Sequence, residues 1–139
     1  MNQIELAKQR LLGTDGLPGL LAAAWDSFEV VMAVAAAAAD QSADMYPALT
    51  LARGSAVSGR NAIAFAPSMP DGHAALTDRP PPDMSDVYEV AEAMVELASA
   101  LSGSLRDAAG LAVDARDRAA CQDAALHAEQ IGRLLAGSE

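Results

Sequence analysis

The amino-acid sequence predicts an all-α protein: a four-helix bundle of the up-down type, with a long proline-rich crossover between its second and third helices. The 139 residues include 33 alanines and only 4% aromatic residues, and alanine favours helix because it loses no side-chain entropy. In four long segments apolar residues recur at alternating spacings of three and four, which places them on one helix face. No segment alternates apolar and polar residues for long enough to indicate a strand.

The chain is predicted to form one main domain. Residues 1–16 are expected to form a short N-terminal segment, helical from Asn2 to Leu12, and residues 17–139 a single helical-bundle domain. The first bundle helix should run from Leu17 to about residue 42, because Pro18 is tolerated in a first turn. Asp26 lies away from its apolar stripe, which consists of Leu17, Leu21, Ala24, Phe28, Val31, Ala35 and Ala38.

The second helix is predicted over residues 47–65 and is the weakest of the four. Gly54 and Gly59 each lower helix stability by about 1 kcal/mol relative to alanine. Small residues dominate its apolar stripe, which consists of Leu49, Ala52, Ala56, Gly59 and Ile63.

Residues 66–83 hold five of the seven prolines and are predicted to form a surface crossover. Proline fixes φ and lacks an N–H donor, so this segment cannot be helical throughout. Loops of this length are often functional, which makes it the first place to seek a partner site. A plain spacer that returns the chain along the bundle is the favoured alternative.

Two regular helices follow the crossover. The third is expected to be capped by Ser85, and its stripe comprises Val87, Val90, Met94, Leu97, Leu101, Leu105, Ala108 and Ala112. The fourth is expected to be capped by Asp114 or Asp117, and its stripe comprises Cys121, Ala124, Ala128, Ile131 and Leu135. The link between them is short, which predicts antiparallel neighbours.

Charge and composition exclude several partners. Nine basic and nineteen acidic residues give a net charge of −10, which repels nucleic acid and anionic membrane surfaces. The single Cys121 excludes an intrachain disulfide. No signal-peptide pattern opens the sequence, and the longest uncharged apolar run, residues 30–39, is too short to cross a bilayer. A cytoplasmic protein with neither a nucleic-acid nor a membrane partner is therefore predicted.

No set of residues indicates catalysis, a metal site or a cofactor. Four carboxylates, of Asp86, Glu89, Glu92 and Glu96, lie opposite the apolar stripe of their helix, which favours a solvated face. Bundle metal sites use inward carboxylates and a Glu-x-x-His pair, which is missing from this sequence. Cys121 lies within an apolar stripe and should be a buried hydrophobe. His127, one turn after Asp123, is expected to be a boundary histidine that is hydrogen-bonded to Asp123. Because no catalytic set is present, we do not predict an enzyme.

The apolar residues outside the four stripes include Leu20, Trp25, Met32, Val57, Phe65, Leu126 and Leu134. This surplus predicts a small protein-interaction, scaffold or regulatory protein that binds a protein partner or itself, as a homodimer. The alternative is a binder of a small apolar or anionic ligand, in the bundle core or under the 66–83 loop. The candidate contact residues for these functions are Trp25, Met32, Arg53, Arg60, Asn61, His73 and Arg79.

Overall fold

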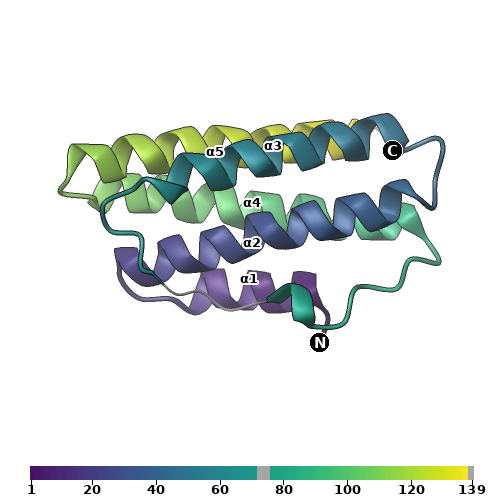
Figure 1. The fold of residues 1–139 in the computed structure, drawn as a ribbon, viewed down its shortest axis with the longest axis horizontal. Helices are drawn as coiled ribbons and strands as arrows, with labels where there is room; N and C mark the ends of the chain where they lie inside the picture. Colours follow the sequence, from purple (N-terminus) through teal and green to yellow (C-terminus); the bar gives the residue numbers. More distant parts are fainter. Residues whose placement is uncertain (72–75, 138–139) are drawn as a thin grey trace.

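The computed structural model describes residues 1–71 and 76–137, and this part of the chain contains α-helices, one 3-10 turn and no strand. The helices pack into a compact bundle (Figure 1), which confirms the predicted all-α class. Their bounds are α1 (Gln3–Gly13), α2 (Leu17–Ala39), α3 (Tyr46–Ala64), α4 (Val87–Leu111) and α5 (Ala115–Ala136), and the 3-10 turn η1 (Leu76–Asp78) lies in the crossover.

The four long helices form two antiparallel pairs, α2 with α3 and α4 with α5, and α5 also packs along α3. The crossover runs the length of the bundle, so that α3 and α4 point in the same direction (Figure 1). Helices that are neighbours in the bundle therefore run in opposite directions, although α3 and α4, which follow each other in the sequence, run in the same direction. This arrangement has one long crossover, unlike a bundle in which every connection is short.

The N-terminal segment is a full part of the bundle. Asn2 caps α1 by a capping box, in which the Asn2 side chain accepts from the Glu5 N–H at 3.0 Å and Glu5 accepts from the Asn2 N–H at 3.1 Å. Helix α1 packs against both α2 and α4 and buries Ile4, Ala7 and Leu11. Helix α1 thus covers the side of the bundle on which α2 and α4 meet.

Helix α1 also changes the environment of Asp26. The Asp26 carboxylate forms an ion pair with Arg10 of α1 and is only 2% exposed. Asp26 lies away from the apolar stripe of α2 and is nevertheless buried. A helix face without large apolar residues can still be buried when a neighbouring helix brings a matching charge.

The predicted apolar stripes form the core. Every stripe residue named for α3, α4 and α5 is buried, and only Leu17 of the α2 stripe is partly exposed. Helix α2 is long and apolar enough to span a membrane by length and composition, yet 61% of its most apolar window is buried inside the bundle. The buried apolar residues of α2 belong to the core of the bundle.

The N-cap of α4 differs from the prediction, and the N-cap of α5 is one of the two residues predicted. Asp86, not Ser85, caps α4: its side chain accepts from the N–H groups of Tyr88 at 3.0 Å and Glu89 at 3.4 Å. The N–H of Ser85 instead donates to Asp83, which lowers the pKa of the Asp83 carboxyl. Asp114 caps α5 by accepting from the Arg116 N–H at 2.8 Å.

The crossover is fixed to the bundle at two points. Ser68 donates to the buried Asp117 through its N–H at 3.0 Å and its hydroxyl at 2.6 Å. Gln3 donates through its side chain to the carbonyls of Thr77 at 3.1 Å and Arg79 at 2.8 Å, and through its N–H to Pro80 at 3.0 Å. These bonds attach the described ends of the crossover to α1 and α5.

Candidate interaction surface

Two of the predicted contact residues, Trp25 on α2 and Arg60 on α3, lie together. The guanidinium carbon of Arg60 is 5.4 Å from the centre of the Trp25 ring, and its Nη1 is 3.3 Å from Glu29 Oε1. A cation over an indole face is attracted by the ring quadrupole. Arg60 is thus already engaged by two side chains of α2. A hollow of about 320 Å³ adjoins Trp25 and is lined by Ala64, Phe65, Ala66, Met69, Pro70 and Asp71.

The other predicted contact residues do not join this pair. Met32 is half-buried against the core, and Arg53 and Asn61 are exposed on α3. The Arg79 side chain is exposed in the crossover. His73 lies outside the described residues.

One apolar groove lies at an end of the bundle that no prediction singled out. It is a hollow of about 450 Å³ between the end of α1, the start of α2 and the last turns of α4. Gly16, with φ of 84°, adopts the left-handed conformation that this α1–α2 turn requires. The lining comprises Leu11, Leu12, Thr14, Gly16, Leu17, Leu20, Ser104, Asp107, Ala108 and Leu111. We call this groove, together with Val113, the leucine end.

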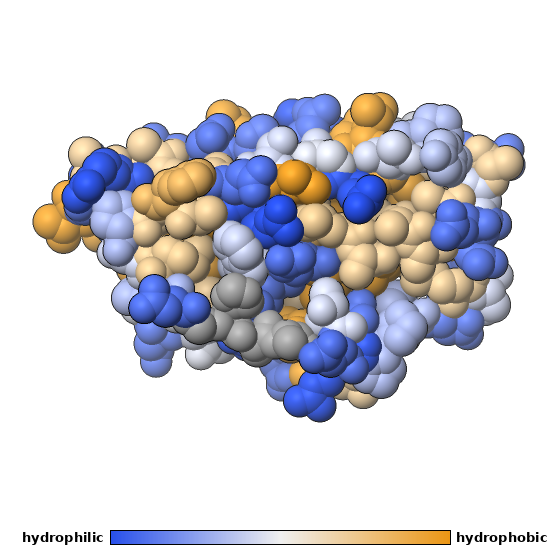
Figure 2. Space-filling view, in the orientation of Figure 1, coloured by the Kyte–Doolittle hydropathy of each residue, from blue (hydrophilic) through white to orange (hydrophobic). Residues whose placement is uncertain are grey.

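Large apolar side chains are exposed around the leucine end. Leu12 is 67%, Leu111 83% and Val113 96% exposed. Figure 2 shows strongly hydrophobic atoms at the end where α4 turns into α5, at the left of the view. Single exposed leucines are ordinary, but a cluster beside an apolar groove is typical of a surface that binds another molecule.

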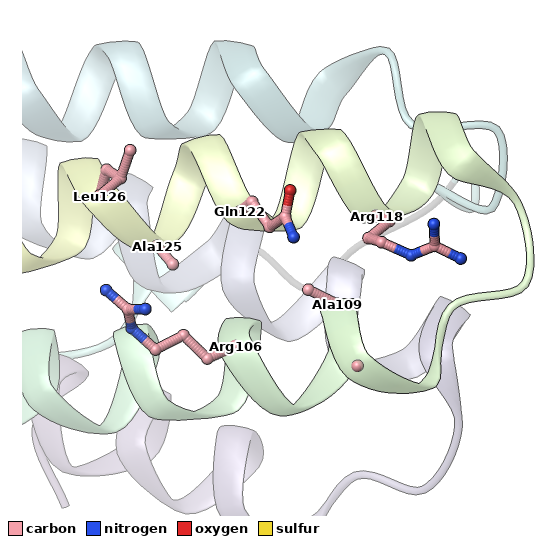
Figure 3. Close-up of a pocket in the computed structure, with 7 residues that line it drawn as sticks. Arg106, Ala109, Arg118, Gln122, Ala125 and Leu126 are labelled. Atoms are coloured by element: carbon pink, nitrogen blue, oxygen red, sulfur yellow. The ribbon is translucent and has the colours of Figure 1, made fainter.

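A second groove follows the outer side of α4 and α5. Figure 3 shows the side chains of Arg106 on α4 and Gln122 and Arg118 on α5 around a hollow of about 660 Å³, whose floor is formed by Ala109 and Ala125. A further hollow of about 350 Å³ continues between the same two helices. Small residues make this second hollow shallow and open: Ala98, Ser99, Ser102, Ala128, Gly132 and Ala136.

The cations of this groove are held in place by neighbours. Arg106 forms an ion pair with Glu129 across the groove. Arg118 donates through Nη2 to the Ala112 carbonyl at 3.1 Å. At the α4–α5 turn, Arg116 Nη2 lies 3.1 Å from Asp114 Oδ2, which raises the pKa of Arg116 and lowers that of Asp114.

The residues considered for metal binding or nucleophilic chemistry lie on α4 and α5. Glu89, Glu92 and Glu96 are exposed, and no cluster of three or more histidine, cysteine or acidic side chains suited to a metal occurs within residues 1–71 and 76–137. Cys121 is fully buried, and burial raises the pKa of its thiol to about 11. His127 Nε2 lies 3.7 Å from Asp123 Oδ1, which is too far for the expected hydrogen bond.

The leucine end could have been partly found in the sequence. Leu111 and Val113 flank the point where the apolar stripe of α4 stops, so large apolar residues occur where the helix pattern no longer buries them. Leu12 could not be recognised in this way, because its exposure depends on how α1 docks. The surplus of apolar residues outside the stripes pointed instead to Phe65 and Leu126, which are 89% and 56% exposed. The other five residues of that surplus are only partly exposed.

The fold and its surface define a small helical bundle with two open grooves. Comparisons with models of protein families, with curated proteins and with solved structures found no match.

Proposed function

We propose that this protein is a protein-interaction module that binds a partner at the leucine end. The observation that supports this proposal is the exposure of Leu111 and Val113, at 83% and 96%, beside an apolar groove of about 450 Å³. Removing apolar surface from water contributes about 25 cal/mol per Å², so a partner that covers these side chains gains affinity from them. Apolar anchors set in grooves dominate the energy of many protein interfaces.

The charge around the leucine end indicates the chemistry of this partner. Asp107 lines the groove and Asp15 is exposed next to Gly16, in a chain of net charge −10. An amphipathic helix with apolar anchors and a basic rim would match both the groove and its edge. Opposite charges at the rim would also speed association.

A helical peptide library displayed on phage would test this proposal. Selection on the folded protein should enrich amphipathic peptides with Lys or Arg beside apolar anchors. The variant Leu111→Asp/Val113→Asp should lose at least tenfold in affinity for the enriched peptides, because it places carboxylates where apolar contact is needed. Equal binding by this variant, or no enrichment above background, would contradict the proposal.

A matched control is Tyr46→Asp/Leu51→Asp on α3, which changes two exposed apolar residues, 54% and 59% exposed, on another helix. Its peptide binding should equal that of the unmodified protein. Chemical shifts of α1 and α4 in NMR titrations would show whether a selected peptide lies at the leucine end.

The same proposal includes the architecture and setting of the module. We propose that α2 to α5 act as a four-helix scaffold with one long crossover, to which α1 is added. The protein would act as a homo-oligomer in the cytoplasm, without a catalytic role, cofactor, nucleic acid or membrane. The net charge of −10 supports the last two points, because it repels phosphate groups.

A second candidate function is the binding of a small apolar or anionic ligand under the crossover. The stacking of Arg60 on Trp25 beside a hollow of about 320 Å³ favours this candidate. Trp25 is the sole tryptophan of the chain, so its fluorescence would report such a ligand directly. A screen of small carboxylates should then change Trp25 emission, and Arg60→Gln should weaken the response to anionic ligands but not to neutral ones.

A further inference from the structure

We infer that the outer surface of α4 and α5 is a self-association face, on which a second copy of this chain packs with its α4 antiparallel to the first. We call this surface the α4–α5 face. It comprises Glu92, Val95, Glu96, Ser99, Ser102 and Arg106 on α4, and Arg118, Gln122, Leu126, Glu129 and Arg133 on α5.

The charge of this face differs from that of the rest of the molecule. It carries three of the nine basic residues of the chain and three of the nineteen acidic residues, so its net charge is zero in a chain of net charge −10. Two copies that meet at any strongly acidic surface repel each other. The α4–α5 face lets two copies approach without that repulsion.

The charges of the face are also arranged so that it complements itself. Ser99 lies midway along α4 between Glu92 and Arg106, each about 10 Å away at a rise of about 1.5 Å per residue. A two-fold axis near Ser99 therefore brings Arg106 of one copy opposite Glu92 of the other, and the reverse pair forms by symmetry. Such mutual pairing defines an isologous dimer. Glu92 forms no ion pair within the described part of the chain, so its carboxylate is available.

Helix α5 follows the same symmetry. Arg106 pairs with Glu129, and Glu129 and Arg133, one turn apart on α5, both line the same hollow as Ser99. Rotation about the same axis brings Glu129 of one copy near Arg133 of the other. Leu126, which is 56% exposed, then faces the part of the shallow hollow formed by Val95 and Ala136. An apolar residue thus meets a surface that can accept it.

The shape of the face suits helix packing. Ser99, Ser102 and Gly132 line its centre and carry small side chains or none. Helix axes approach to about 8 Å where the contact residues are small. Each copy contributes two helices side by side, each about 10 Å wide over a contact length of about 27 Å. The contact area is therefore roughly 500 Å² per copy, which is below the standard interface of about 800 Å². The dimer should therefore be reversible, with a Kd in the micromolar range.

In this dimer the two leucine ends lie at opposite ends, about 36 Å apart, because each Leu111 is about 18 Å from the axis. If the proposed function is correct, the dimer presents two partner sites and binds a bivalent partner with increased avidity. This last consequence rests on the proposed function, whereas self-association through the α4–α5 face does not.

Sedimentation equilibrium between 5 and 200 μM in low salt tests the inference. The unmodified protein should dimerise, and the dimer should weaken as salt is added, because exposed pairs are screened. Arg106→Glu places like charges opposite Glu92, and Glu92→Arg places like charges opposite Arg106. Each variant alone should dimerise at least tenfold more weakly.

An equimolar mixture of Arg106→Glu and Glu92→Arg should restore a heterodimer, because both pairs are then of opposite charge. This recovery separates the inference from any damage within a subunit, such as repulsion between the introduced carboxylate and Glu129 in the first variant. The matched control is Arg53→Glu, which makes the same charge change on an exposed residue of α3 and should leave the Kd unchanged.

Three results would overturn the inference: an unmodified protein that stays monomeric at 200 μM, a mixture that does not recover, or a dimer abolished by Leu111→Asp/Val113→Asp and unaffected by Arg106→Glu. The last result would assign self-association to the leucine end. Peptide binding by a monomeric protein would support the partner site at the leucine end and contradict only the homo-oligomeric state, so the partner site and the self-association face fail separately.

Discussion

Gly59 of α3 packs directly against the ring of Phe28 of α2, so that a side chain as small as a methyl group at position 59 would overlap ring atoms. Phe28 is fully buried and is among the largest side chains of the core. The glycine that lowers the propensity of α3 is thus the residue that admits this ring. The close packing of α2 on α3 depends on it.

We expect Gly59→Ala to destabilise the protein by about 1 to 3 kcal/mol, the usual cost of overpacking a filled core. Gly54 provides the control, because nothing lies within 4 Å of the position its Cβ would take. Gly54→Ala should stabilise by up to about 1 kcal/mol through helix propensity. Urea unfolding followed by circular dichroism measures both, and equal effects of the two variants would contradict this account.

The Arg10–Asp26 ion pair should attach α1 to the bundle. Arg10→Ala is expected to destabilise by about 2 to 4 kcal/mol, because the nearly buried Asp26 carboxylate loses the charge that faces it. Replacing both residues, by Arg10→Met and Asp26→Leu, should recover most of this loss. Hydrogen exchange would locate the change: if α1 exchanges no faster in Arg10→Ala, the pair does not hold the helix.

The thiol of Cys121 should be inert while the protein is folded. Burial raises its pKa from an ordinary value of 9.0 to about 11, so little thiolate is present at pH 8. A disulfide reagent should label Cys121 only at the rate of unfolding, and rapidly in urea. Fast labelling of the folded protein would show that the thiol is accessible.

The same shift makes stability depend on pH. The unfolded thiol ionises first, so the folded state binds the extra proton between pH 9 and about 11 and loses stability as the pH rises through this range. Below pH 9 both states are protonated and the effect is absent. Cys121→Ala should remove this part of the pH dependence of the free energy of unfolding, and an unchanged slope would contradict the assignment.

The cap of α4 gives a prediction with a neighbouring control. Asp86→Ala should destabilise by about 1 kcal/mol, because it removes the acceptor of the Tyr88 and Glu89 N–H groups. Ser85→Ala should change stability little, since the Ser85 side chain does not cap the helix. Thermal unfolding of the two variants measures the difference, and the reverse order would restore Ser85 as the cap.

The sequence by itself determined the class of fold, the places of the long helices and the residues of their buried faces. The stripes of α3, α4 and α5 were predicted residue by residue, because a helix repeats every 3.6 residues and its apolar face is a local pattern. The crossover was predicted from the prolines of residues 66–83, which is also a local signal, because proline fixes φ and lacks an N–H donor. The prediction that Ser85 caps α4 was wrong because Ser and Asp both favour the N-cap position, and only the backbone geometry selects between Ser85 and Asp86.

Only the tertiary structure decided the surfaces. Asp26 is buried because α1 docks on α2, and no pattern within α2 records that contact. The leucine end combines residues of α1, α2 and α4. Among the predicted contact residues, Trp25 and Arg60 lie together, and Met32 and Arg53 lie elsewhere. Such placements depend on how helices far apart in sequence pack on one another, and an apolar stripe specifies which face is buried without specifying its neighbour.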